Sequence, residues 1–550
     1  MRISVAQLNY HIGNFDLNKS LICKAIVKAR EAGSELVIFS ELCISGYPPL
    51  DLLDRYDFIE KCNQTVNEIA AECHGIKAIV GSPTINTKPE GKKLYNSALL
   101  LSESKILFTA SKALLPTYDI FDEYRYFEPE KGFSVFSING MKVALTICED
   151  LWDEQPFDNK FEKNRLYTVS PMEELSQHKP DIIINIAASP FSYKKSEAKE
   201  NIFRNKARKY GLPVISVNQT GANTELIFDG ASIIVDPRGE IYKMLPYFEE
   251  SVETFETEDI ISGSVAAKIE KPDEIALIHK ALVTGIRDYF SKSGLRSAIL
   301  GLSGGIDSAV CLCLAKEALG NNNIRSLLMP SRYSSGHSVT DAVELAKRLD
   351  TDYDIINIET PFRAFEEELI PLFREKGRDV TEENIQARIR ATLLMAVSNK
   401  FGCILLNTSN KSEAAVGYGT LYGDMAGGLS VIGDVYKTDI YRLAAYINRE
   451  NEIIPENIIR KLPSAELRPD QLDSDSLPEY SILDNILYNY IELQKPPEQI
   501  IDEGADSETV HKVIRMINFN EYKRYQAPPI LRISSKAFGA GRRMPLVARY

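Results

Sequence analysis

The sequence lacks the features that mark membrane, nucleic-acid-binding and disulfide-rich proteins. It has no apolar run near the roughly 20 residues that a membrane-spanning helix needs. Acidic residues outnumber basic ones, 77 to 64, whereas a nucleic-acid scaffold needs a basic face. Its eight cysteines show neither the paired spacing of a zinc site nor the density of a secreted disulfide scaffold. We therefore expect no membrane partner, no nucleic-acid partner and reduced thiols.

A signal-peptide pattern is also missing from the first residues. Residues 1–6 begin directly as a strand, without the charged and apolar regions of a secretory signal. Since the thiols are expected to be reduced, this predicts a cytoplasmic protein. The 550 residues exceed the size at which a single hydrophobic core stops growing. Two or more globular domains are expected.

One glycine-rich segment joins a predicted strand at residues 297–300 to a predicted helix at residues 309–319. Its residues are Gly301, Leu302, Ser303, Gly304, Gly305, Ile306, Asp307 and Ser308. Glycines let backbone amides approach an anion, the hydroxyls add donors, and the helix N-terminus adds partial positive charge. This combination predicts a phosphate site, and a glycine-rich turn without a ligand is the alternative.

The segment differs from the P-loop of common NTPases, because no stretch of the chain reads Gly-x-x-x-x-Gly-Lys-Ser/Thr. Asp307 stands at the start of the helix instead of that lysine. A carboxylate beside phosphates would repel them unless a metal ion lay between, so Mg²⁺ is implied with the nucleotide. The motif resembles the pyrophosphate loop of the N-type ATP pyrophosphatases. That resemblance implies attack at the α-phosphorus of ATP and release of pyrophosphate.

Strand and helix patterns alternate along both halves of the chain, which predicts α/β domains. Between residues 245 and 273 the pattern loses its periodicity and turns acidic. We place the domain junction there, near residue 262, and predict domains at 1–262 and 263–550. The alternation in the second domain favours a doubly wound parallel sheet. Its expected strands include residues 325–329, 355–358 and 403–406, and the tail beyond residue 469 is expected to be helical to about residue 516.

In the first half, Cys148 ends an apolar strand and precedes a turn. A thiol projected from a strand end resembles the nucleophile arrangement of many α/β hydrolases, although a buried structural cysteine is the commoner case. Glu41 follows another strand, and Lys112 stands where a third strand gives way to a loop that contains Glu123. This Glu, Lys, Cys order is similar to the triad of the nitrilase superfamily of carbon–nitrogen hydrolases, over roughly residues 1–260. The resemblance implies an α-β-β-α sandwich.

The three groups have complementary chemistry. Glu41 can take the thiol proton, and ammonium Lys112 can lower the energy of the thiolate and neutralise a tetrahedral oxyanion. Attack of Cys148 on an amide carbon would give a thioester and ammonia, and water activated by Glu41 would release the acid. Glu123 is expected to orient Lys112. A Cys-His hydrolase is the competing hypothesis, but the six histidines lie outside any recognisable catalytic context.

Members of this superfamily that use glutamine hold it with a tyrosine, a serine and a basic residue. By resemblance, Tyr118, Ser189 and Lys195 would bind glutamine in this chain. Lys195 would meet the α-carboxylate, and Ser189 would donate a hydrogen bond. Lys194 could take the place of Lys195, and all these positions could instead be ordinary surface loop residues.

A domain that frees ammonia, joined to one that activates a substrate with ATP, predicts a glutamine-dependent amidoligase. The second half most resembles the NAD synthetases, a family in which a nitrilase-like glutaminase can be fused to the synthetase. The segments that carry this resemblance are residues 381–390, 405–413, 422–428, 433–439 and 462–469. It implies transfer of ammonia to deamido-NAD through an adenylated carboxylate, giving NAD, AMP and diphosphate. It also implies a homo-oligomer built through the synthetase domain.

The same resemblance assigns individual residues. Those that would add contacts to ATP are Thr408, Lys437 and Ser464. Those that would bind deamido-NAD are Asn384, Glu413 and Lys523. Asp307 and Glu413 are also the candidates for Mg²⁺, so Glu413 is not assigned to a single role. Helix capping or loop hydrogen bonding is the alternative at each polar position.

Two other functions stay open on these grounds. An amidoligase of the same loop class that acts on another carboxylate would share the motifs. So would an amidase whose second half only binds and senses an adenine nucleotide. Release of AMP and pyrophosphate that depends on deamido-NAD separates the three hypotheses.

Overall fold

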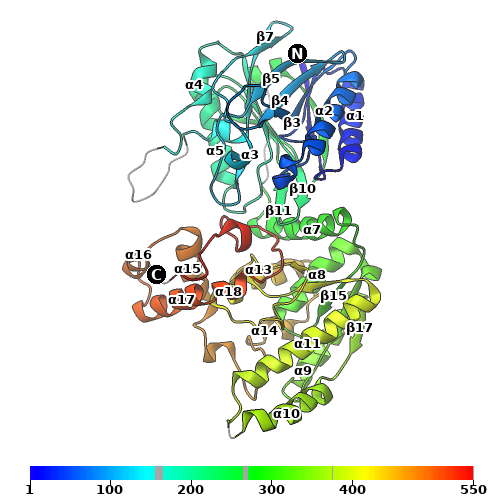
Figure 1. The fold of residues 1–550 in the computed structure, drawn as a ribbon, viewed down its shortest axis with the longest axis vertical. Coiled ribbons are helices and arrows are strands. Elements are labelled where there is room, and N and C mark those ends of the chain that lie inside the picture. The colour runs from blue at the N-terminus through cyan, green and yellow to red at the C-terminus, as the bar shows by residue number, and fades with distance from the viewer. Residues whose placement is uncertain (155–164, 264–270, 375, 549–550) are drawn as a thin grey trace. The chain divides into compact units, whose positions relative to one another are not determined.

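Two compact units make up the chain, Met1–Pro272 and Asp273–Tyr550. The computed structural model describes residues 1–154, 165–263, 271–374 and 376–548 (Figure 1). The predicted junction at residue 262 lies at the end of helix α6 (Thr257–Ser262), and α7 (Glu274–Lys292) begins the second unit. The division between the units therefore falls between these two helices.

The first unit contains two six-stranded sheets. The order of the first sheet is β14 (Ser251–Glu256), β1 (Arg2–Gln7), β2 (Leu36–Ile38), β3 (Lys77–Ile85), β4 (Leu94–Ser102) and β5 (Lys105–Ser111). The order of the second is β13 (Ile241–Met244), β12 (Ile233–Val235), β9 (Val214–Asn218), β8 (Ile182–Ala187), β7 (Met141–Ile147) and β6 (Phe136–Ile138). A separate two-stranded ribbon consists of β10 (Thr220–Asn223) and β11 (Leu226–Asp229).

The two sheets pack face to face through alternating apolar side chains. Ile3 of β1 and Val143 of β7 belong to one buried cluster. The period of two along β7 sends Ala144 to the opposite face, where it packs in a cluster with Phe203. The helices that cover the outer faces are α1 (Phe15–Glu31) and α2 (Tyr56–Glu72) on the first sheet, and α4 (Pro171–Ser176) and α5 (Ser196–Tyr210) on the second. The predicted α-β-β-α sandwich is confirmed.

The second unit has a five-stranded sheet in which all paired strands are parallel. Its order is β17 (Asp352–Ile355), β16 (Ile324–Leu328), β15 (Ala298–Gly301), β18 (Ile404–Asn407) and β19 (Leu429–Ser430). From β15 the chain builds outward to β17 and then returns to the other side of β15 with β18. The carboxyl ends of β15 and β18 therefore form the switch point at which open parallel sheets bind ligands. The predicted doubly wound sheet is confirmed.

The connections of this sheet are mostly helical. The connecting helices are α8 (Ile306–Leu319), α9 (Gly336–Arg348), α10 (Glu359–Phe373), α11 (Val380–Phe401) and α12 (Lys411–Val416). Two further helices, α13 (Lys437–Ile447) and α14 (Glu456–Arg460), follow the last strand. The predicted strand at residues 355–358 is wrong, because β17 ends at Ile355. Ile355 and Ile356 are exposed, whereas Ile358 is fully buried and donates its N–H to the carbonyl of Pro330. Ile358 therefore packs the connection that leads into α10.

The tail beyond residue 469 is helical only in pieces. Its helices include α15 (Tyr480–Leu487), α16 (Pro497–Asp502) and α17 (Ser507–Phe519). A buried ion cluster holds the irregular arm that follows. Nζ of Lys411 lies 2.9 Å from Oδ1 of Asp434 and 2.9 Å from Oε1 of Glu492, and it donates to Oγ of Ser534 at 2.8 Å.

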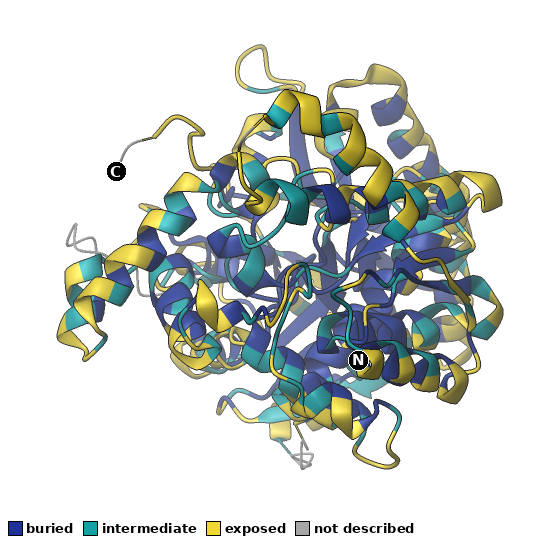
Figure 2. Ribbon diagram, turned by 90° about the horizontal axis from the view of Figure 1, so that it is seen from below, coloured by how far each residue is buried: buried dark blue, intermediate teal, exposed yellow. Residues whose placement is uncertain are grey.

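Burial follows the sheets in both units. Figure 2 shows dark blue strands and helices that carry exposed residues along one face. Within the described residues, no helix combines the length and the apolarity that crossing a membrane would require.

Candidate active sites

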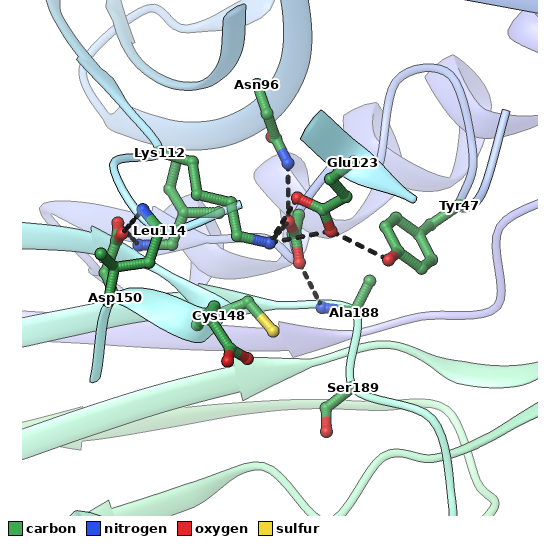
Figure 3. A network of polar contacts seen from close by, with 12 residues as sticks. Tyr47, Asn96, Lys112, Leu114, Glu123, Cys148, Asp150, Ala188 and Ser189 are labelled. Atoms are coloured by element: carbon green, nitrogen blue, oxygen red, sulfur yellow. Dashed lines mark hydrogen bonds and ion pairs between the residues drawn. The ribbon is translucent and has the colours of Figure 1, made fainter. Parts of the chain in front are cut away.

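In the first unit, three strand ends bring Glu41, Lys112 and Cys148 together. Glu41 lies in the turn after β2, Lys112 directly follows β5, and Cys148 directly follows β7. Nζ of Lys112 lies 2.8 Å from Oε1 of Glu41 and 2.9 Å from Oε1 of Glu123 (Figure 3). Figure 3 shows the sulfur of Cys148 on the side of its turn that faces this ammonium. All four side chains are buried.

Neighbouring groups fix the two carboxylates. Oε1 of Glu41 accepts a hydrogen bond from the amide of Asn96 at 2.7 Å, and Oε2 accepts the N–H of Ala188 at 2.9 Å. Oε1 of Glu123 accepts the hydroxyl of Tyr47 at 2.9 Å. Sequence reasoning missed these three partners, because a strand asparagine, a loop tyrosine and a backbone N–H carry no motif.

A glycine on β3 makes room for the turn that carries Glu41. A Cβ atom at Gly81 would lie 2.3 Å from the nitrogen of Leu42 and 2.8 Å from the carbonyl carbon of Glu41. Backbones this close leave no space for a side chain. The position of Glu41 therefore depends on a residue forty positions away in the sequence.

Burial dominates the protonation of this site. It raises the pKa of the Cys148 thiol well above its usual value, and Lys112 only partly opposes that rise. Burial alone would lower the pKa of Lys112, but Glu123 and Glu41 outweigh it and raise that pKa. Burial also raises the pKa of Glu123, to about 7. In the resting site the Cys148 thiol is therefore neutral and the Lys112 side chain stays protonated. The thiolate forms only when a base removes the thiol proton.

The nucleophile turn adopts an uncommon backbone shape. Cys148 has a φ of +44°, in the left-handed region that non-glycine residues rarely adopt, and it begins a 3₁₀ helix at Cys148–Leu151. The next side chain, Glu149, is buried and accepts the hydroxyls of Tyr118 at 2.9 Å and Tyr167 at 2.8 Å. Tyr118, a predicted glutamine contact, therefore lies beside the nucleophile turn. Glu149 and Tyr167 were not predicted.

The other predicted glutamine contacts lie between β8 and α5. Ser189 is half-buried, and its N–H donates to Oδ1 of Asn218 at 2.9 Å. It directly follows Ala188, whose N–H binds Glu41. Lys194 and Lys195 are both exposed just before α5, so burial does not favour one over the other.

In the second unit, the glycine-rich segment lies at the switch point, between β15 and α8, and two cavities open on it. Residues that line the larger one, of about 250 Å³, include Gly301, Ser303, Arg390 and Thr408. Residues that line the smaller one, of about 170 Å³, include Ser303, Asp307, Glu413, Lys437 and Ser464. We call the smaller cavity the charged compartment. Ser303 borders both cavities, so a nucleotide base and its phosphates could occupy them together.

Lys437 joins two carboxylates in the charged compartment. Its Nζ atom is ion-paired with Oδ2 of Asp307 and lies 3.5 Å from Oε1 of Glu413. Asn410 donates to Oδ1 of Asp307 at 2.8 Å. Burial and the nearby Asp307 raise the pKa of Glu413 to about 8, although Lys437 opposes the rise. The structure thus brings predicted ATP and metal residues together.

Asn384 and Lys523 meet at the segment that follows α12. Oδ1 of Asn384 accepts the hydroxyl of Thr420 at 2.7 Å. Nζ of Lys523 donates to the carbonyls of Gly417 at 2.7 Å and Gly419 at 2.8 Å. These two of the three predicted deamido-NAD contacts therefore bind residues 417–420.

Arg390 is a cavity residue to which sequence reasoning gave no role. Its Nε donates to the carbonyl of Met329 at 3.1 Å, and burial lowers its pKa to about 10. The segment that contains it was part of the family resemblance, but only the cavity marks the side chain as a candidate ligand contact.

Two family models match most of the chain. Residues 2–258 match carbon-nitrogen hydrolase, and residues 278–527 match NAD synthase. The glutamine-dependent NAD(+) synthetase of Synechocystis sp. is 41% identical, over 100% of this chain and 99% of that protein. The one from Thermotoga maritima is 39% identical, over 100% of this chain and 99% of that protein.

Solved structures match over the full length as well. The glutamine-dependent NAD+ synthetase from Acinetobacter baumannii, in complex with adenosine diphosphate, is 37% identical with a TM-score of 0.77, covering 99% of this chain and 98% of that chain. The enzyme of that name from Cytophaga hutchinsonii, 21% identical with a TM-score of 0.83, shares the fold over 100% of this chain and 98% of that chain.

A carbon–nitrogen hydrolase unit and an ATP-using synthetase unit in one chain define a glutamine-dependent amidoligase. The chain belongs to the glutamine-dependent NAD(+) synthetases. Its reaction is the ATP-dependent amidation of deamido-NAD to NAD, with glutamine as the nitrogen donor. The predicted family and function are confirmed, in preference to an amidoligase for another acceptor or an amidase with a nucleotide sensor.

Proposed function

We propose that Cys148 attacks the side-chain amide of glutamine, with Glu41 as general base and Lys112 as the cation that stabilises the oxyanion. The observation that carries this assignment is the buried ammonium, bound by Glu41 and Glu123 and faced by the sulfur. Glu41 takes the thiol proton as the sulfur attacks and gives it to the amide nitrogen, which leaves as ammonia when the thioester forms. Glu41 then activates the water that releases glutamate. Positive charge fixed in a buried site favours the oxyanion over the ground-state amide.

Glu149 is our candidate for the α-ammonium of glutamine. It directly follows the nucleophile, is buried, and is held by the hydroxyls of Tyr118 and Tyr167. A buried carboxylate gains most from a cationic partner, and the substrate carries one. Ser189 and Lys195 are proposed as further contacts, the lysine for the α-carboxylate. Glu149→Gln should therefore raise the KM for glutamine more than it lowers kcat.

In the second unit, residues 301–308 are proposed to hold the phosphates of ATP, with contacts from Thr408, Lys437 and Ser464. The nicotinate carboxylate of deamido-NAD attacks the α-phosphorus, and pyrophosphate leaves. Ammonia then attacks the adenylated carbonyl, giving NAD and AMP. Loop N–H groups, the start of α8 and Lys437 offset the charge of the departing pyrophosphate.

Mg²⁺ fits the charged compartment. Asp307 and Glu413 offer carboxylate oxygens, and phosphates would offer more, which is the ligand set that Mg²⁺ prefers. We propose that these two residues hold it; when bound, it neutralises phosphate charge. Asn384, Glu413 and Lys523 are proposed to bind deamido-NAD, so Glu413 would serve both ligands.

A homo-oligomer through the synthetase unit is also proposed. Helix α10 exposes Phe365 and Leu372, which lie seven residues apart on one helix face, at 52% and 74% of their surface. Light scattering should show a smaller species for a Phe365→Glu, Leu372→Glu double variant; an unchanged mass would exclude this face as the interface. The cytoplasmic location stays a prediction from the sequence.

Two variants of the full chain test the separate roles of the units. Cys148→Ala should abolish NAD synthesis from glutamine and keep synthesis from added ammonium salt, because only the nitrogen source is lost. Asp307→Ala should lose both activities, together with pyrophosphate release. Glutamine-supported synthesis by the first variant, or near-normal ammonia-supported turnover by the second, would contradict these assignments.

A further inference from the structure

Asp150, two residues after the nucleophile, is a buried carboxylate whose hydrogen-bond partners are backbone groups of two separate segments. Its Oδ1 atom accepts the N–H groups of Ala113 at 3.0 Å and Leu114 at 2.9 Å, and its Oδ2 atom accepts the N–H of Ile147 at 3.0 Å. Figure 3 shows the carboxylate facing the Leu114 backbone. The side chain is only 3% exposed. Burying a carboxylate is costly unless fixed dipoles compensate its charge, and here three backbone N–H groups do so.

The three N–H groups belong to the two chain segments that carry the reacting side chains. Ala113 directly follows Lys112, and Ile147 directly precedes Cys148. Lys112 leaves the end of β5 in the first sheet, and Cys148 leaves the end of β7 in the second. No ladder among the described strands pairs these two sheets, so regular hydrogen bonding does not set the distance between the two ends. The carboxylate of Asp150 bridges them directly.

The same carboxylate supports the uncommon backbone of the nucleophile. Ile147 is the residue before the 3₁₀ helix Cys148–Leu151, and Asp150 is its third residue. The bond from the Ile147 N–H to Oδ2 therefore closes the turn around Cys148, whose φ is +44°. Such a conformation persists only where surrounding contacts fix it.

We propose that Asp150 is a positioning residue for glutamine hydrolysis, whose carboxylate fixes the Cys148 turn against the Lys112 segment. This inference rests on the proposed roles of Cys148 and Lys112. In this role Asp150 acts through the two backbones whose N–H groups it accepts. Its two oxygens offer the acceptors that three converging N–H groups require, with one oxygen turned to each segment.

Asp150→Asn is the first test, because it keeps the shape and removes one acceptor. If the amide oxygen of the new side chain faces Ala113 and Leu114, its NH₂ group faces the N–H of Ile147, which loses its acceptor. If the amide is flipped, the N–H groups of Ala113 and Leu114 lose their acceptor instead. In either orientation the side chain no longer bridges the two segments by hydrogen bonds. We expect kcat for glutamine hydrolysis to fall about 10- to 100-fold, with the KM for glutamine within about threefold of wild type.

Asp150→Glu is the second test, because it keeps charge and both acceptors but lengthens the side chain by one methylene. It should fold as wild type does and still lose at least about fivefold in kcat, since it moves the two segments apart. Asp153→Asn is the matched control. Asp153 is equally buried in the same segment, but it binds Nζ of Lys206 at 2.6 Å and the hydroxyl of Ser170, away from both reacting groups.

All variants are measured as the full chain, with glutamate release for hydrolysis, ammonia-supported NAD synthesis for the other unit, and thermal unfolding for the fold. A kcat loss in both Asp150 variants, with near-normal kcat in Asp153→Asn, supports the proposal. Wild-type kcat in Asp150→Glu, or an equal loss in Asp153→Asn, would overturn it. Glutamine hydrolysis by Cys148→Ala would instead defeat the proposed nucleophile, whatever the Asp150 variants do.

Discussion

The ammonium of Lys437 is paired with the carboxylate of Asp307. Asp307 lies in the first turn of α8, and Lys437 is the first residue of α13, so the pair joins two helix starts. Glu413 lies 3.5 Å from the same ammonium. One cation thus serves two carboxylates at the place where the phosphates of ATP are proposed to bind.

Removing this cation should impair the synthetase reaction with either nitrogen donor. In Lys437→Met the two carboxylates and the phosphates of ATP would lose this ammonium, so we expect kcat/KM for ATP to fall about 100-fold or more. Glutamate release from glutamine, measured separately, should persist. Lys400→Met, at the exposed end of α11, is the matched control and should resemble wild type. A loss confined to glutamine-supported synthesis would refute the role.

A methyl group at residue 81 should displace the general base. In Gly81→Ala, the Cβ would overlap the backbone of Leu42, so Glu41 must move, and kcat for glutamine hydrolysis should fall about 100-fold. Ammonia-supported synthesis should continue. In Gly132→Ala, the control, the new Cβ meets only Oε1 of Glu130 at 3.7 Å, and both activities should remain. Full hydrolysis by Gly81→Ala would show that the base tolerates displacement.

Stability should depend on pH through Glu123. Burial raises its pKa to about 7 in the folded chain, against an ordinary value of 4.5, so between these values the folded state binds more protons than the unfolded one. The contribution of this group to the free energy of unfolding therefore falls as pH rises from 4.5 to 7 and is constant above that.

Glu123→Gln cannot titrate, which isolates the effect. Between pH 5 and 7 the melting temperature of wild type should fall relative to that of the variant, and the gap should stop changing above about pH 8. Glu174→Gln, at an exposed position on α4, should run parallel to wild type. If the melting temperature of Glu123→Gln also ran parallel to that of wild type across this pH range, the Glu123 carboxyl group would have the same pKa in the folded and unfolded states.

Breaking the buried ion cluster of the tail should destabilise the second unit. Lys411→Met leaves the carboxylates of Asp434 and Glu492 buried without their cation, which should lower the free energy of unfolding by about 3 to 5 kcal/mol. Denaturant unfolding of the full chain measures this. Lys512→Met, which removes an exposed lysine, is the control. If both variants unfolded at the same denaturant concentration, the ion cluster would have no stabilising role.

Strand ends are what the sequence reveals best. Apolar runs that stop at Glu41, Lys112 and Cys148 mark the ends of strands, which is where catalytic side chains are expected. In the structure these ends belong to two different sheets, with Glu41 and Lys112 on the first and Cys148 on the second. The loop at residues 301–308 is visible for the same reason, because its glycines follow a short apolar strand. The order of Glu41, Lys112 and Cys148 along the chain carries the nitrilase resemblance, whereas the NAD synthetase resemblance also needs the five segments between residues 381 and 469.

Contacts between distant segments are not visible in the same way. Asn96 binds Glu41 from β4, which is separated from β2 by another strand. The bonds of Asp150 depend on how two sheets face each other, which no local pattern encodes. The apolar residues 355–358 misled the strand prediction, because Ile355 and Ile356 are exposed and only Ile358 is buried, so the apolar run does not mark a buried strand. Partners of this kind require the tertiary structure.

Glycine would adopt the backbone of Cys148 without steric conflict, because it has no Cβ. Cys148→Gly should therefore melt at a higher temperature than Cys148→Ala, although it buries less apolar surface. Being inert and better tolerated by the main chain, it would be the preferred form for trapping intact glutamine in a crystal. The nucleophile must carry sulfur at a backbone conformation that favours glycine, so its reactivity should come at the expense of thermal stability.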